Sequence, residues 1–174
     1  METQVTETQS GQASLAPSAS LAPFPVHASA VALGESGVMI RGASGEGKST
    51  LALALVEAWE RRGDFARLVG DDRVIVRIVN GRALVSPHSA LSGLAEWRGI
   101  GLIEREYEAC VVLALIVDLE SPEQQAACPR LPETEELCVD FHNLHDVARL
   151  RLPARETERS VAAVMAFLHK VSPK

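Results

Sequence analysis

Apolar and polar residues alternate along this chain in short blocks whose spacing predicts strands and two helices. Residues 26–33 form an almost continuous apolar stretch, and residues 38–41 form another after a Gly-rich turn; both are predicted to be strands. Between positions 50 and 59 the apolar residues recur three or four positions apart, which is the spacing of an amphipathic helix. The same spacing between positions 161 and 168 predicts a final helix with one face on the core.

Strand signals dominate the rest of the chain. A strand is expected at residues 65–69, directly after the first helix, and the order strand, helix, strand predicts a right-handed crossover between parallel strands. Asn80-Gly81 is a two-residue hairpin turn. The other predicted strands cover residues 73–79, 82–85, 110–119, 137–140 and 147–152. This succession predicts an α/β fold in which helices flank a central sheet.

Composition bounds the domain organisation. Residues 1–25 are rich in Ser, Thr, Gln, Ala and Pro and contain no basic residue, so we expect a disordered tail before one domain over residues 26–172. Hydrophobic residues make up 47% of the 174, which is enough for a core. The net charge of −6 gives no indication of a nucleic-acid surface.

The cysteines and the apolar stretches bear on the compartment. Three cysteines without paired spacing predict neither a disulfide framework nor a zinc site, and Cys110, at the start of an apolar stretch, is expected in the core. Apolar stretches are too short to span a membrane, and the N-terminal residues lack the pattern of a signal peptide. We therefore expect a cytoplasmic protein that makes no contact with membranes.

The strongest chemical signal is G-A-S-G-E-G-K-S at Gly42–Ser49, which is the pattern of a phosphate-binding P-loop. A predicted strand precedes it and a predicted helix follows it, as that loop requires. Lys48 is expected to reach the β- and γ-phosphates of ATP, and the Ser49 hydroxyl is expected to bind Mg²⁺. The candidate phosphate-binding residues are Gly42, Ala43, Ser44, Gly45, Glu46, Gly47, Lys48, Ser49 and Thr50.

Asp71 and Asp72 follow the strand predicted after the P-loop helix, at the edge of the sheet where ligands bind in α/β folds. One carboxylate can hold Mg²⁺ while the other accepts a proton from a hydroxyl nucleophile. An acidic surface turn is the alternative. By pattern alone, His27 is more simply structural, and the charged residues around Gly99 and Gly101 fit a bent strand as well as a binding segment.

Four segments in order resemble HPr kinase/phosphorylase: His27-Ala28-Ser29, the P-loop, Val69–Val74, and Glu96–Ile103, which is similar to that family's signature. The chain resembles the short alphaproteobacterial form, which corresponds to the catalytic domain only. The resemblance implies a P-loop kinase domain related to phosphoenolpyruvate carboxykinase, with a central mixed sheet. It also implies a kinase that uses ATP and Mg²⁺ to phosphorylate a serine of the phosphocarrier HPr, and in many members the reverse phosphorolysis.

The family's roles transfer to this chain by position. Asp72 matches the carboxylate that acts as base in the kinase direction. The resemblance assigns Ser49 and Glu96 to the metal site, to which the reasoning from the aspartate pair adds Asp71. The further active-site residues are His27, Lys48, Asp71, Arg98 and Arg130. The family also forms hexamers, so the resemblance implies a homo-oligomer.

Two departures from the family pattern affect these expectations. Ala43 stands where the family usually has Asp, and the segment associated with dephosphorylation survives only as Leu150–Arg155. Kinase activity is therefore the firmer expectation. A P-loop kinase of a small metabolite and a non-catalytic ATP-sensing module remain the alternatives.

Overall fold

The computed structural model describes residues 22–97 and 99–171; most of the predicted tail and the candidate residue Arg98 lie outside them. The strands are β1 (Phe24–Val26), β2 (Ser29–Leu33), β3 (Ser36–Arg41), β4 (Ala66–Gly70), β5 (Val74–Val79), β6 (Arg82–Pro87), β7 (Leu94–Trp97), β8 (Gly101–Glu104), β9 (Val111–Glu120), β10 (Cys138–Phe141) and β11 (Leu144–Pro153). The helices are α1 (Lys48–Glu60), α2 (Pro122–Ala126) and α3 (Thr157–Val171), with short 3₁₀ turns η1 (Ser89–Leu91) and η2 (Thr134–Leu137).

Nine of these strands form one mixed sheet, in which β3 and β11 run parallel to β9 and the other pairs are antiparallel. The predicted α/β class with a mixed sheet is therefore confirmed. Strands β3 and β4, joined by α1, run in the same direction as predicted, but β2 lies between them and is antiparallel to both. The start of β2 therefore meets the ends of β3 and β4 at one edge of the sheet.

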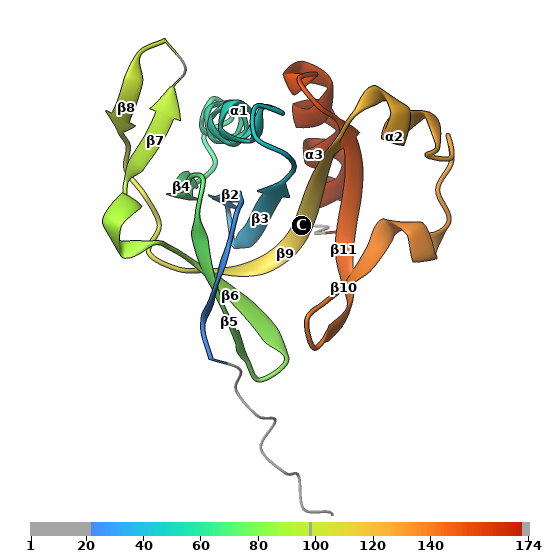
Figure 1. The fold of residues 1–174 in the computed structure, drawn as a ribbon, viewed down its shortest axis with the longest axis horizontal. Helices are drawn as coiled ribbons and strands as arrows, with labels where there is room; N and C mark the ends of the chain where they lie inside the picture. Colours follow the sequence, from blue (N-terminus) through green and yellow to red (C-terminus); the bar gives the residue numbers. More distant parts are fainter. Residues whose placement is uncertain (1–21, 98, 172–174) are drawn as a thin grey trace, which may run out of the picture.

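The alternation of side chains along the strands builds two cores, one on each face of the sheet. Val31, Val38 and Ile40 point to the face that packs against α1 and α3. Their neighbours Ala30 and Met39 point to the opposite face, into a cluster with residues of β5, β6 and β10. Figure 1 shows α1 and α3 above the curved sheet, and the β7–β8 hairpin projecting at the upper left. Because successive residues of a strand point to opposite faces of the sheet, these strands bury side chains on both faces.

The structure corrects several expectations about the strands. The apolar stretch 26–33 is not one strand: the chain bends at His27, and β1 pairs with β5 while β2 pairs with β3. Phe24 and Pro25, expected in the tail, belong to β1, where an edge position tolerates a proline without an N–H group. The glycines at 99 and 101 adopt φ angles of 85° and 105° in the β7–β8 hairpin, which replaces the expected bent strand.

Cys110 is exposed, and the expectation that it lies in the core is wrong, because β9 begins one residue later and Val111 is its first buried residue. The region between β9 and β10, for which the sequence pattern predicts neither a helix nor a strand, contains α2 and η2. Within the part of the chain that the structure describes, no helix has both the length and the apolar composition needed to cross a membrane.

Candidate phosphate-binding and catalytic site

The P-loop is the turn between β3 and α1, and its shape depends on glycine. Gly42 has a φ of 150°, and a Cβ atom there would lie 3.2 Å from the Leu119 carbonyl oxygen. The Lys48 ammonium group donates hydrogen bonds to the carbonyl oxygens of Gly42 and Ala43, each at 3.0 Å. The N–H groups of the first turn of α1 have no partners within the helix, so they are free to bind an anion.

A cavity of about 360 Å³ opens in front of this loop. Asp72 and Glu96 line it on the side of β4 and β7, while Arg155 and Thr157 line it at the junction of β11 and α3. The loop side consists of Ser44, Gly45, Gly47, Lys48, Ser49 and Thr50. Gly42, Ala43 and Glu46 do not line the cavity. The fold thus brings Lys48, Ser49, Asp72 and Glu96 together from segments far apart in the sequence.

The two neighbouring aspartates have opposite environments. Asp71 is only 3% exposed, and its carboxylate accepts hydrogen bonds from the Ser29 hydroxyl at 2.6 Å and from the Glu96 N–H at 3.0 Å. Asp72 has a φ of 62°, and its side chain is 63% exposed at the cavity. Asp71 therefore fixes the Glu96 backbone to the end of β4. It is not among the residues that line the cavity, and its role as a metal ligand stays a prediction.

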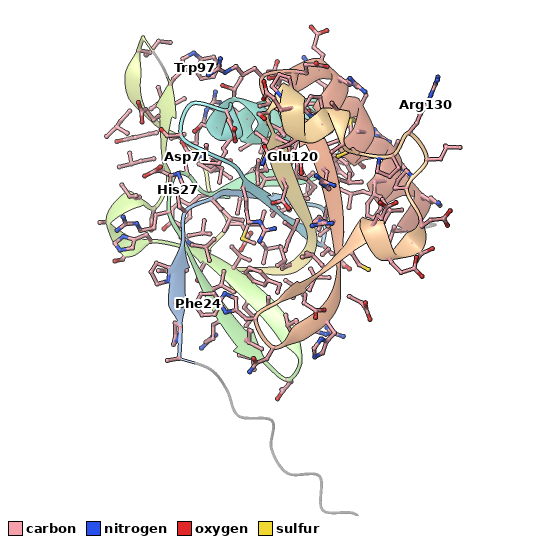
Figure 2. The ribbon with its side chains drawn as sticks, turned by 45° about the vertical axis from the view of Figure 1, so that its right-hand side comes forward. Phe24, His27, Asp71, Trp97, Glu120 and Arg130 are labelled. Carbon is pink, nitrogen blue, oxygen red and sulfur yellow. The ribbon has the colours of Figure 1, made fainter. Side chains whose placement is uncertain are left out.

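His27 lies beside Asp72, with its Nδ1 atom 3.2 Å from an Asp72 carboxylate oxygen. It occupies the bend before β2, and β2 runs between the strands that carry the P-loop and the aspartates. Figure 2 shows His27 and Asp71 close together at this edge of the sheet. The reading of His27 as an ordinary structural residue, which its pattern alone favoured, does not account for this pairing with a cavity carboxylate.

Arg155 reaches the P-loop from the other side of the cavity. Its Nε–H donates to the Gly45 carbonyl oxygen at 3.1 Å, and its backbone N–H donates to the Glu46 carbonyl oxygen at 3.1 Å. It was absent from the predicted site residues. The only signal in the sequence was its position in the segment Leu150–Arg155, which resembles the family's dephosphorylation segment.

The structure does not bring Arg130 to this cavity. Arg130 lines a separate hollow of about 390 Å³ between the α2–η2 segment, β11 and α3, and Figure 2 shows it projecting at the upper right, away from His27. The α2–η2 segment, which carries Arg130, is held against β11, because Arg149 donates a hydrogen bond to the Glu136 carbonyl oxygen. The expectation that Arg130 joins the phosphate site is therefore not met in this arrangement.

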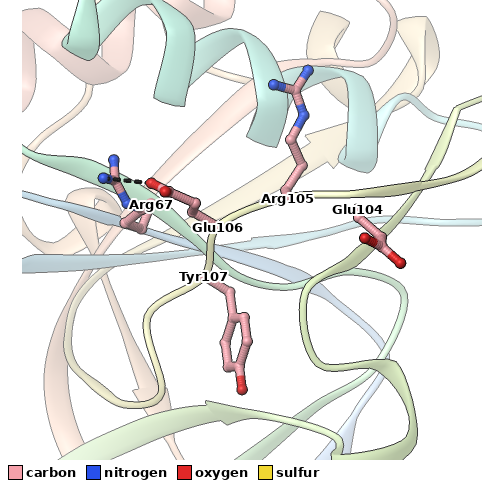
Figure 3. A pocket seen from close by; sticks show the side chains of 5 residues that line it. All are labelled: Arg67, Glu104, Arg105, Glu106 and Tyr107. Atoms are coloured by element: carbon pink, nitrogen blue, oxygen red, sulfur yellow. Dashed lines mark ion pairs between the residues drawn. The ribbon is translucent and has the colours of Figure 1, made fainter.

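A third hollow, of about 630 Å³, lies between Arg67 of β4 and residues 104–107 at the end of β8, and is drawn in Figure 3. Arg67 and Glu106 form an ion pair at 2.7 Å, while Arg105 and Tyr107 point in different directions. No P-loop residue lines this hollow, so it does not extend the phosphate site.

The oxygen atoms at the cavity suit Mg²⁺. Mg²⁺ prefers oxygen ligands and is usually held by one or two protein groups together with phosphates and water. Ser49 and Glu96 provide such groups on opposite sides of the cavity. Among the described residues no cluster of three or more His, Cys, Asp or Glu residues could hold a metal alone. The donor set therefore fits a metal that arrives with a nucleotide.

Comparison with known proteins identifies relatives of this chain. Residues 19–171 match the family model of the HPr Serine kinase C-terminal domain. HPr kinase/phosphorylase of Enterococcus faecalis is 36% identical over 137 residues, covering 74% of this chain and 41% of that protein. The protein of the same name from Shouchella clausii is 37% identical over 144 residues, covering 78% of this chain and 44% of that protein.

A solved structure, the Hpr(Ser) kinase/phosphatase from Coxiella burnetii, matches the fold with a TM-score of 0.65. It is 22% identical, and the match covers 84% of this chain and 89% of that one. At this identity the likeness supports the fold alone. The chain spans less than half the length of the two curated relatives described above.

Proposed function

Because this chain belongs to the family of HPr serine kinase C-terminal domains, we propose that it transfers the terminal phosphoryl group of ATP to a serine hydroxyl of an HPr-type carrier protein. The observation that carries the proposal is the cavity shared by Lys48, Ser49 and Asp72. A phosphate-binding loop and an exposed carboxylate at one cavity are the two parts that phosphoryl transfer to a hydroxyl requires.

The residues would divide the work as follows. The loop N–H groups and Lys48 hold the phosphates in line with the incoming hydroxyl. Asp72 accepts the proton of that hydroxyl, and His27 orients the Asp72 carboxylate through the contact at 3.2 Å. Bound Mg²⁺ would offset the charge on the phosphates, and Ser49 and Glu96 are the residues that would hold it.

The openness of the acceptor side favours a protein as the acceptor. The side chains of Asp72 and His27 are 63% and 53% exposed, so a hydroxyl on the surface of a folded protein can approach them. Trp97, Ile100 and Leu102, on the hairpin that carries Glu96, are also exposed. A kinase of a small metabolite would be expected to enclose its acceptor instead. Assembly into a hexamer stays a prediction.

Transfer to a purified carrier tests the proposal. The protein is incubated with Mg²⁺, ATP labelled on the terminal phosphate, and an HPr-type carrier, and the carrier is analysed by mass spectrometry. We expect one phosphate on one serine, and no label when that serine is replaced by alanine. ATP turnover without any labelled protein would favour a metabolite kinase. Nucleotide binding without turnover would favour the sensing module.

A further inference from the structure

Glu46 places a carboxylate inside the phosphate-binding loop itself. Its Oε2 atom accepts a hydrogen bond from the backbone N–H of Ala43, at the beginning of the same loop. The side chain is half-buried, and no ion pair to it is found within the described residues. One N–H group of the loop is therefore already bound to a carboxylate of the protein itself.

This contact interlocks with the other features that shape the loop. The Ala43 peptide donates its N–H to Glu46 and accepts the Lys48 ammonium on its carbonyl oxygen, so both of its polar groups are fixed from within the motif. Gly42 leaves room for the carboxylate, since a Cβ there would lie 2.6 Å from Oε2. Arg155 holds the carbonyl oxygens of Gly45 and Glu46 from outside.

The carboxylate has two opposing effects on a phosphate ligand. Its hydrogen bond orders the loop before binding, so less conformational entropy is lost when the ligand arrives. Its negative charge belongs to the loop that borders the cavity, although the side chain does not line it, and the charge repels the phosphates.

We propose that Glu46 is a positioning residue that holds the loop in its phosphate-binding shape before nucleotide arrives, and that its charge makes nucleotide affinity lower than an uncharged acceptor at the same position would give. The proposal deepens the proposed function at the same site, but it concerns nucleotide binding and not transfer to the acceptor. Glutamine and alanine separate the two effects, because glutamine keeps an acceptor oxygen without the charge and alanine removes both.

The test measures the dissociation constant of Mg²⁺–ADP by calorimetry for the wild-type protein, Glu46→Gln and Glu46→Ala. Because Glu46→Gln removes the repulsion and keeps an acceptor, although a weaker one, we expect it to bind about 3-fold more tightly. Because Glu46→Ala releases the Ala43 amide, we expect it to bind about 10-fold more weakly. Glu57→Gln is the matched control, since it removes the same charge from an exposed position on α1, and it should leave the affinity unchanged.

The order of the three affinities decides the proposal. Equal affinities, or Glu46→Gln binding as weakly as Glu46→Ala, would overturn it. If Glu46→Ala does not fold, as judged by thermal unfolding, Glu46→Leu takes its place, because leucine also lacks an acceptor oxygen. If the wild-type protein binds ADP but labels no carrier, the proposed function fails and the order of affinities still tests Glu46. If the wild-type protein does not bind ADP, both fail.

Discussion

Two loops leave adjacent parallel strands at the same edge of the sheet, and they differ in what holds them. The P-loop follows β3, and its bonds are largely internal: Lys48 donates to the carbonyl oxygens of Gly42 and Ala43, and Glu46 accepts from the N–H of Ala43. The α2–η2 segment follows β9, and side chains of the strands hold it. Gln125 donates a hydrogen bond to Glu120 of β9, and Arg149 of β11 donates one to the Glu136 carbonyl oxygen. A loop whose hydrogen bonds join residues of its own motif keeps its shape wherever the motif occurs. A loop that is held by side chains of other elements takes its position from the fold.

This difference explains which arginine contacts the P-loop. Arg130 lies on the segment held from outside and lines another hollow. Arg155 follows β11, the strand that pairs with β9, and it contacts the P-loop directly. Substitutions in the two loops should therefore have effects of very different size.

The largest effect is expected for Lys48→Ala, in the loop held from within. The change removes the cation for the phosphates and also releases the Gly42 and Ala43 carbonyl oxygens. We expect phosphoryl transfer to fall by about 1000-fold, as when a main electrostatic contact to the reacting group is lost. Steady-state transfer to the carrier measures it. Activity within a few-fold of the wild-type protein would show that the loop does not hold the reacting phosphates.

Asp71→Ala should damage stability more than any change in the α2–η2 segment. It leaves the buried Ser29 hydroxyl and the Glu96 N–H without their acceptor. We expect the free energy of unfolding to fall by about 3 kcal/mol, because an unpaired buried donor such as the Ser29 hydroxyl costs about 1–3 kcal/mol and the part-buried Glu96 N–H adds a smaller loss. Urea unfolding measures the change. Asp72→Asn is the control, since Asp72 is exposed, and a similar loss there would refute the contrast between the two aspartates.

Arg155→Ala should have an intermediate effect. It removes the hydrogen bond to the Gly45 carbonyl oxygen and a cation at the cavity, at a partly solvated position. We expect KM for ATP to rise about 5-fold to 10-fold, equivalent to one hydrogen bond of ordinary strength. Arg155→Lys, which keeps the charge, should recover part of the loss. An unchanged KM would mean that the contact to Gly45 does not matter for binding.

The smallest effect is expected for Arg130→Ala. The side chain is exposed and lies outside the phosphate cavity, so the change should alter transfer by less than about 2-fold, as is usual for surface substitutions. The same transfer assay measures it. A loss as large as that of Lys48→Ala would mean that the α2–η2 segment moves to the site during the reaction, or that Arg130 acts on a neighbouring molecule.

The contrast between contacts within a motif and contacts with distant elements also separates what the sequence predicts from what it cannot. The P-loop and α1 follow from local spacing, and the strand pattern gives the class of fold. The position of His27 does not follow, because it depends on β2 running between β3 and β4, and no alternation of residues encodes that order. Glu96 and Arg155 likewise reach the cavity through the β7–β8 hairpin and β11. Only the resemblance to a family pointed to His27 and Glu96.

The central claim is that Asp72 acts on the hydroxyl while the P-loop binds the nucleotide. Single-turnover transfer by Asp72→Asn, with the affinity for Mg²⁺–ADP measured on the same preparation, tests it most directly. Asparagine tolerates the positive φ at this position, so the fold is preserved. We expect transfer to slow by about 100-fold or more while the affinity stays within about 2-fold. Transfer at the wild-type rate would contradict the account.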